Sequence, residues 1–272
     1  DNIINVNNLL GTDLSRSELN LFDNFLNIGD VDYFNQNLTL NYSLPFSSFP
    51  YLDFIQSSYT YSGNFNWQRG SDILNNVTDS NGIVLGNIST IQNSNNQSIV
   101  ASLNFDKFYR NFKFLNKKNN FFDILKSLKR VRVNYTENSG KVIPGYVPSI
   151  GFFGTSKPSF GFIFGNQSNV RYELAKMGYL TNFSGFNEQF QQVFNSKFEM
   201  SAEIQLFKNL KIDLNANRNY SNNYSENFRV NNNNYEILNP NFYGNFSISS
   251  NMLKTSFDKK SIDQSDSFDN MK

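Results

Sequence analysis

The feature that most constrains the fold of this chain is a set of long runs in which apolar and polar residues alternate one by one. The clearest run extends from Phe198 to Leu206, and a second run follows from Leu210 to Arg218. Side chains of a β-strand point to opposite faces in turn, so a period of two predicts strands with one apolar and one polar face. We therefore expect an all-β chain of antiparallel strands, about eight to ten in number.

The two runs also predict how they pair. A slip of one residue would place apolar side chains opposite polar ones, so Ile204 should oppose Ile212. Each strand would have about ten residues, the length that crosses a bilayer when tilted. The same rule pairs Leu206 with Leu210 and leaves a three-residue turn of Phe207, Lys208 and Asn209, in which Asn tolerates the left-handed conformation.

Similar patterns divide the rest of the chain. Alternation predicts further strands at 37–44, 59–67, 82–91, 98–105, 130–135, 224–230, 242–250 and 253–257, with turns at 75–81 and 231–234. Helical spacing of apolar residues predicts short helices within 106–128, 169–180 and 184–194, where Asn169 would begin a helix and Gly178 would end it. The expected organisation is a connecting segment (1–36), barrel strands (37–105), a loop or short helix (106–128), a strand (129–140), a Gly/Pro/Phe-rich loop with short helices (141–196), strands (197–258) and a polar tail (259–272).

The composition favours a wet, uncharged surface. Charged residues make up 17% of the chain and aromatic residues 16%, so the polarity comes from Asn, Ser, Gln and Thr. A biased genome could also enrich Asn. A barrel with a polar lumen explains these neutral polar faces and the aromatic residues near strand ends better than a soluble sandwich does. The candidate lumen-facing residues are Asn37, Thr39, Asn41, Ser43, Asn215, Asn217 and Asn219.

Several classes of chemistry are disfavoured. The chain has no Cys and no His, which removes disulfides, Cys-His and Ser-His-Asp catalysis, and the common transition-metal sites. Glu199 and Glu203 share a strand face, but nothing in the sequence supplies a cleft around them. A net charge of +1 gives no electrostatic case for nucleic acid. We expect neither an enzyme nor a cofactor.

The segment Val142–Gln167 is dense in Gly, Pro and Phe, and Lys157 is its only charged residue. Pro and Gly at this density prevent a regular helix or a central strand, and so many Phe residues would not stay exposed. We expect the segment to be packed, either as a plug-like loop in the mouth or lumen of a barrel or as a docking surface for a partner. The candidate gating or partner-contact residues are Tyr146, Phe152, Phe153, Phe160, Phe162 and Phe164.

Several ordered stretches resemble one family. They read LNYSLPFSSFPYLD (40–53), YTYSGNFNW (59–67), GNISTIQNSN (86–95), PGYVPSIGFFG (144–154) and GFIFGNQSNVRY (161–172). Their order resembles the SprA (Sov) family of Bacteroidota, the outer-membrane translocons of type IX secretion and gliding motility. The resemblance implies an arc of a very large barrel that passes folded cargo proteins, with a PorV-type shuttle and a periplasmic plug protein as partners. It also implies that this chain is a fragment of a longer protein.

Two other functions remain open from the sequence. A β-rich surface adhesin or binding module would be extracted in buffer without detergent. A plugged nutrient-uptake barrel would close with about 22 strands and take a small ligand.

Overall fold

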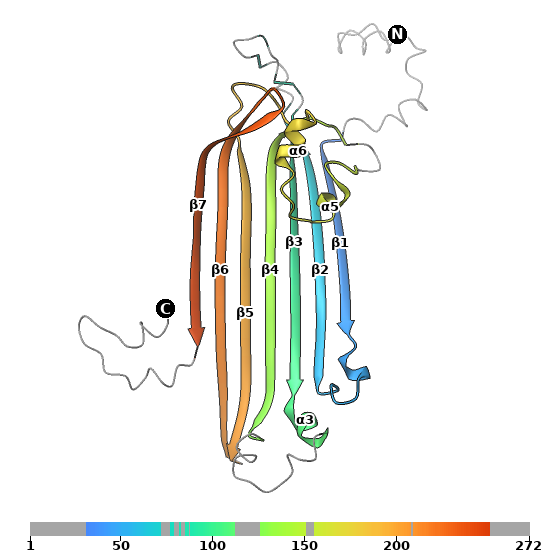
Figure 1. The fold of residues 1–272 in the computed structure, drawn as a ribbon, viewed down its shortest axis with the longest axis vertical. Helices are drawn as coiled ribbons and strands as arrows, with labels where there is room; N and C mark the ends of the chain where they lie inside the picture. Colours follow the sequence, from blue (N-terminus) through green and yellow to red (C-terminus); the bar gives the residue numbers. More distant parts are fainter. Residues whose placement is uncertain are drawn as a thin grey trace, which may run out of the picture. The chain divides into compact units, whose positions relative to one another are not determined.

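The computed structural model describes residues 31–71, 77–78, 82, 85–86, 88–111, 126–150, 155–207 and 209–250. Within these ranges the chain forms one antiparallel sheet of seven strands, in which each strand pairs with its neighbour in sequence (Figure 1). The sheet is open, with β1 and β7 at its edges. The strands are β1 (Tyr33–Leu44), β2 (Ile55–Arg69), β3 (Ser89–Asn104), β4 (Leu128–Tyr146), β5 (Gln189–Phe207), β6 (Leu210–Asn231) and β7 (Asn234–Ser250).

Short helices lie at the two ends of this sheet. The lower end in Figure 1 carries η1 (Phe46–Ser48) and α3 (Phe105–Asn111), and the upper end carries α5 (Phe160–Ile163) and α6 (Arg171–Lys176). Of the helix predicted within 106–128, α3 confirms the beginning, and 112–125 lie outside the described residues. The helix predicted within 169–180 is α6, and Gly178 follows it with a φ of +70°. Asn169 is not its cap, because Val170 holds that position.

The β5–β6 hairpin confirms the predicted register except at its turn. Ile204 opposes Ile212, and the pairs toward the upper end keep apolar residues on one face. The predicted pair of Leu206 with Leu210 is wrong, because Phe207 opposes Leu210 and a bulge lies between Gln205 and Phe207. The bulge adds one residue to β5, so Phe207 joins the strand and the turn is shorter than predicted. The apolar and polar residues of both strands keep their faces.

The strands are far longer than predicted. β5 has 19 residues and β6 has 22, about twice what a tilted strand needs to cross a bilayer. The run predicted as a separate strand at 224–230 is the upper part of β6. The predicted turn at 231–234 is confirmed, with φ of +46° at Asn232 and +61° at Asn233, the geometry that favours Asn in two-residue hairpins.

The Gly/Pro/Phe-rich loop is correspondingly shorter than 141–196. β4 continues through Tyr146, and β5 begins at Gln189. The helix predicted at 184–194 is wrong: residues 184–188 form a turn and an irregular stretch, and β5 begins at Gln189. Phe190 and Phe194 are four residues apart, a spacing that places both on one face of a strand as well as of a helix. Of the predicted strand at 82–91, the described residues form a strand from Ser89 onward, and 83–84, 87 and 253–257 lie outside the described residues.

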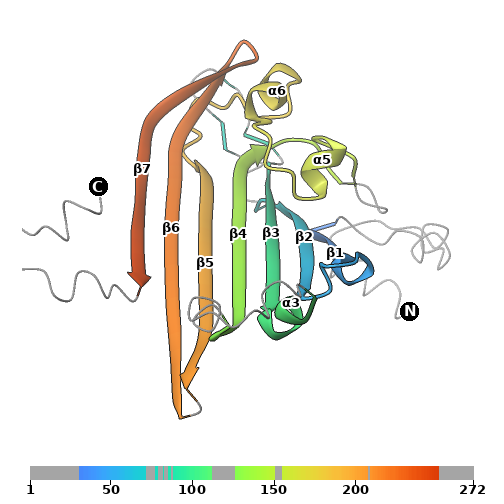
Figure 2. The same ribbon diagram turned by 60° about the horizontal axis from the view of Figure 1, so that its bottom comes forward.

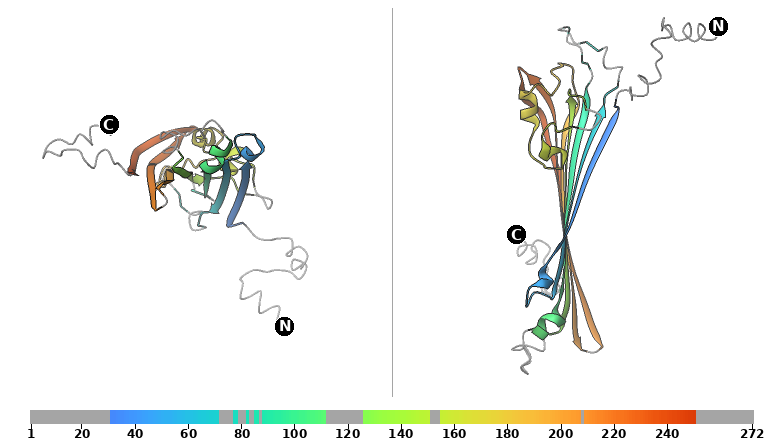
Figure 3. Two further views of the ribbon diagram at one scale, coloured as in Figure 1. Left: turned by 90° about the horizontal axis from the view of Figure 1, so that it is seen from below. Right: turned by 90° about the vertical axis from the view of Figure 1, so that its right-hand side faces the viewer.

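The seven strands share two continuous faces, which the register defines. The polar face contains the rows through Asn41, Thr60, Ser98, Thr136, Lys197, Asn219 and Ser247 and through Thr39, Ser62, Asn96, Asn138, Asn195, Ser221 and Asn245. The opposite face, which we call the loop face, contains the row through Tyr42, Tyr59, Ile99, Tyr135, Phe198, Arg218 and Ile248. An edge-on view shows the twist of the sheet and places α5 and α6 on one side of its upper half (Figure 3).

Candidate functional site

The upper half of the loop face is covered by residues 155–188, which we call the plate. Asn93 donates hydrogen bonds from Nδ2 to the carbonyl oxygens of Phe162 (3.1 Å) and Asn166 (2.8 Å). Asn95 Nδ2 donates to the carbonyl of Gly165 at 2.8 Å. Amide side chains of β3 thus satisfy the backbone of an irregular segment, which is the condition for burying such a segment.

A glycine allows the plate to approach the sheet closely. A Cβ atom on Gly63 would lie 2.1 Å from the carbonyl oxygen of Phe164, so no other residue fits without displacing the plate. The neighbouring Tyr61 donates its hydroxyl hydrogen to the same oxygen at 2.6 Å. Both residues lie on the loop face of β2, so this part of β2 is the surface against which α5 packs.

Apolar packing fills the rest of this contact. Phe162 is fully buried, and its ring meets Phe65 edge-on at 6.2 Å between centroids. Trp67, the one tryptophan of the chain, is also buried, and its Nε1 donates to the carbonyl of Pro148 at 3.4 Å. Of the described residues of the Phe-rich loop, Tyr146, Phe162 and Ile163 are buried, as predicted for a packed loop, whereas Phe160 is exposed.

Lys141 joins β4 to the plate. Its side chain is buried, and its ammonium donates to the carbonyl of Ser168 at 2.9 Å and to that of Gln167. Burial, together with the nearby Arg171 guanidinium, lowers the pKa of Lys141 to about 8. Burying the charged ammonium therefore costs free energy, which its two hydrogen bonds to the plate offset only in part.

A second charge anchors α6. Glu226 on β6 is completely buried and accepts hydrogen bonds from Arg171, Tyr224 and Tyr235. The Arg171 guanidinium also lies over the ring of Phe190, 4.6 Å from its centroid. β6 and β7 curve over α6 at this end (Figure 2). Phe190, Tyr224 and Tyr235 surround the guanidinium, and we call this cluster the aromatic cage. The ion pair inside it attaches the plate to the last three strands.

The sequence reasoning missed this cage, although one signal was present. Tyr224, Glu226, Phe228 and Val230 share one face of β6, so Glu226 interrupts an apolar stripe. A carboxylate in such a stripe needs a buried partner. Nothing in the sequence indicates that the partner comes from position 171.

The candidate gating or partner-contact residues of the loop differ in how deeply they are buried. Tyr146 and Phe162 are buried and therefore cannot contact a partner while the plate is docked. Phe160 is 69% exposed, and its ring lies 4.9 Å from the half-buried Phe164. Phe152 and Phe153 lie outside the described residues.

The seven candidate lumen-facing residues all lie on the polar face, four on β1 and three on β6. Asn41 accepts a hydrogen bond from Thr60 Oγ1 at 2.9 Å, and Asn219 donates to Ser247 at 3.4 Å. The plate lies on the other face, so the prediction of a lumenal plug cannot hold together with a lumen lined by these residues.

Below the plate, the loop face is bare and apolar. Its upper limit is a row of aromatic residues in register across four of the first five strands: Tyr42, Tyr59, Tyr135 and Phe198. Below this row, no paired residue described on this face is charged. We call this surface the apolar band: Leu44, Ile55, Ala101, Leu103, Leu128, Val131, Val133, Met200, Ala202, Ile204, Leu210, Ile212, Leu214 and Ala216.

The polar face at the same height is charged. Arg130, Arg132, Glu199, Glu203 and Asp213 alternate along the strands with residues of the apolar band. Lys197 pairs with Glu199 at 2.7 Å, and Lys211 lies 3.6 Å from Glu203. The two faces of one strand thus carry side chains of opposite polarity at the same height.

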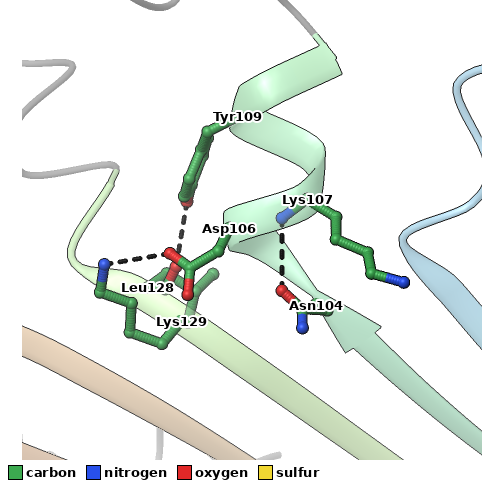
Figure 4. A network of polar contacts seen from close by, with 6 residues as sticks. All are labelled: Asn104, Asp106, Lys107, Tyr109, Leu128 and Lys129. Atoms are coloured by element: carbon green, nitrogen blue, oxygen red, sulfur yellow. Dashed lines mark hydrogen bonds and ion pairs between the residues drawn. The ribbon is translucent and has the colours of Figure 1, made fainter.

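Aromatic residues also lie at the lower end of the sheet. Phe54 contacts Phe108 with 4.9 Å between ring centroids, and Phe105 and Tyr109 complete the cluster. α3 is held there by a hydrogen bond from Tyr109 to the carbonyl of Leu128 and by the Asp106–Lys129 ion pair (Figure 4). Phe54 of this cluster also lines a cavity on the polar face, beside Arg130 and Arg132.

The described residues contain no group of three or more His, Cys, Asp or Glu side chains arranged to hold a metal ion. No helix within the described part is long and apolar enough to span a membrane. Comparison with known proteins gives no match, either to a protein-family model or to a curated protein.

Proposed function

We propose that this sheet is an arc of an outer-membrane β-barrel and contributes to the protein-conducting translocon of type IX secretion. The apolar band would face lipid and the polar face would line the lumen. The observation that carries the proposal is the opposite polarity of the two faces at one height. Below the aromatic row, charged residues are confined to the polar face, while the paired residues of the other face are apolar or uncharged.

The dimensions of the apolar band support this placement. At about 3.3 Å per residue, the stretch from Phe198 to Phe207 is about 30 Å long. Tilted barrel strands cross a hydrocarbon core with about this length and carry aromatic residues at both interfaces. The exposed fractions of Tyr42 (55%) and Ile248 (50%) are unusual for large apolar side chains in water but ordinary for side chains in contact with lipid.

The topology and the polar face support a conduit. A meander of neighbouring antiparallel strands is the connectivity of membrane barrels, and the open edges at β1 and β7 would continue into further strands. Asn, Ser and Thr side chains bind water without strong charge or apolar contact, so a polypeptide passing along them would be held only weakly. The secretion assignment itself rests on the resemblance to the SprA family, which also implies the shuttle, plug and cargo partners.

The placement can be tested position by position, because the chain has no cysteine of its own. Single cysteines at Ala202 and Leu214 on the apolar band, and at Ser201 and Asn215 on the polar face, would carry spin labels. In membranes, the first pair should be accessible to oxygen, and the second pair to a water-soluble nickel reagent. Equal accessibility of both pairs would refute the two-sided placement.

The secretion assignment needs a separate experiment in the bacterium that carries the gene. Inactivating the gene should remove cargo proteins from the cell surface while small-nutrient uptake continues. Loss of nutrient uptake with normal cargo display would instead support an uptake barrel. Extraction of the native protein by buffer alone would support a surface adhesin.

A further inference from the structure

The lower end of the polar face contains a cavity of about 260 Å³ beneath α3. Three cationic side chains line it: Arg130 and Arg132 from β4 and Lys107 from α3. The remaining polar lining consists of Asp53, Gln56, Ser102 and Asn104. The cavity lies on the face opposite the apolar band.

None of the three cationic groups has an ion-pair partner among the residues that the structure describes. Glu203 opposes Arg130 across the β4–β5 pair, but Glu203 and Asp213 form their ion pairs with Lys211, and Glu199 forms its ion pair with Lys197. Figure 4 shows the Lys107 side chain extending away from the Asp106–Lys129 ion pair.

Asp53 is the single carboxylate in the lining, and it accepts a hydrogen bond from Asn111. Three cations and one carboxylate leave two positive charges in excess.

The cavity is held in shape by its surroundings. Asn104 Oδ1 accepts a hydrogen bond from the backbone N–H of Lys107 at 3.3 Å and so fixes the first turn of α3 (Figure 4). Tyr109 and Asp106 tie the same helix to β4. The Lys107 side chain is therefore held in the lining of the cavity by a short helix that is bonded to both β3 and β4.

We infer that this cavity binds a phosphate-class oxyanion. A phosphate group carries up to two negative charges, which matches the excess positive charge, and guanidinium groups match its oxygens with parallel N–H donors. Ser102, Asn104 and Gln56 supply further hydrogen-bonding groups. The phosphate could come from a free phosphorylated solute or from the headgroup of an anionic lipid.

Binding of inorganic phosphate to the purified full chain in detergent, measured by titration calorimetry, tests this inference. Arg130→Gln combined with Arg132→Gln should lower the affinity by about tenfold or more, because charge-assisted hydrogen bonds are lost. Lys107→Met should give a smaller loss. Arg229→Gln is the matched control: it removes the same charge from an exposed position at the upper end of β6 and should leave the affinity unchanged.

Vesicles of phosphatidylglycerol, compared with phosphatidylcholine, distinguish the two sources. Arginine-dependent capture by phosphatidylglycerol without binding of free phosphate would assign the site to a lipid headgroup. Binding of both probes would assign it to phosphate groups in general. The inference is overturned if neither probe binds, or if the double arginine variant binds both as well as the unchanged protein does.

Discussion

The upper and lower halves of the loop face belong to the same strands but meet different surroundings. Above the aromatic row, polar residues such as Asn93, Asn95 and Lys141 are interspersed among apolar ones and are buried by the plate. Below it the face is apolar and bare. A face that buries irregular backbone needs side-chain hydrogen-bond donors, whereas a face against lipid needs none. The comparison shows that one face of a single strand can carry buried polar residues along one half and exposed apolar residues along the other.

The largest expected effect concerns the upper half. Glu226→Ala leaves the Arg171 guanidinium buried without its partner, so docking of the plate should weaken by about 3–5 kcal/mol. The fluorescence of Trp67, which is buried where Pro148 contacts it, should shift to the red at lower denaturant concentration. Glu236→Ala removes an exposed carboxylate from β7 and serves as the control. An unchanged Trp67 transition in Glu226→Ala would mean that the cage does not hold the plate.

The next effect concerns the lower half. Leu214→Lys places a charge near the middle of the apolar band and should cost about 2–4 kcal/mol of folding stability in a bilayer. The matched variant Asn215→Lys places the same charge on the polar face and should cost little. Urea unfolding of the chain in lipid bilayers measures both. If the two lysine variants were equally stable, the assignment of the apolar band to lipid would be wrong.

A third prediction tests the steric fit between the plate and β2 in the upper half. Gly63→Ala brings a methyl group against the carbonyl of Phe164 and should weaken plate docking by about 1–3 kcal/mol. Ser62→Ala, one residue away on the polar face, should have almost no effect. Hydrogen exchange of the backbone amides in α5 reports the difference, and equal protection in both variants would show that the plate does not rest on Gly63.

The smallest effect is a pH dependence of plate docking. The pKa of Lys141 is lowered to about 8 in the folded chain from 10.5, so above pH 8 the unfolded state binds more protons than the folded state. Docking should therefore strengthen as pH rises, by about 1 kcal/mol between pH 8 and pH 9. Denaturant titrations that follow Trp67 measure this slope. Lys141→Met should abolish the slope, and a persistent slope in that variant would assign it to another group.

The strands were largely predictable because period-two alternation is a local signal. It placed the two faces of β5 and β6 and the pairing of Ile204 with Ile212 correctly. It failed at Leu206, where a bulge adds a residue without disturbing either face. It also failed at Phe190 and Phe194, because a spacing of four residues is compatible with both a helix and a strand. Strand length was underestimated because alternation weakens where β4 and β6 pass under the plate.

The candidate site was less predictable, because its contacts join distant parts of the chain. Pro and Gly density showed that the loop is packed, but no local pattern indicated which face it covers. That choice depends on Gly63, which leaves room for the Phe164 carbonyl, and on Asn93 and Asn95, which donate to the plate.

The sequence by itself therefore determined that the chain forms amphipathic antiparallel strands, since alternation acts through neighbouring residues along each strand. Only the tertiary structure decided that the plate covers the loop face, and that Arg171 meets Glu226 across 55 positions of the chain. A buried charge shows that a partner must exist, but the fold alone brings that partner within reach.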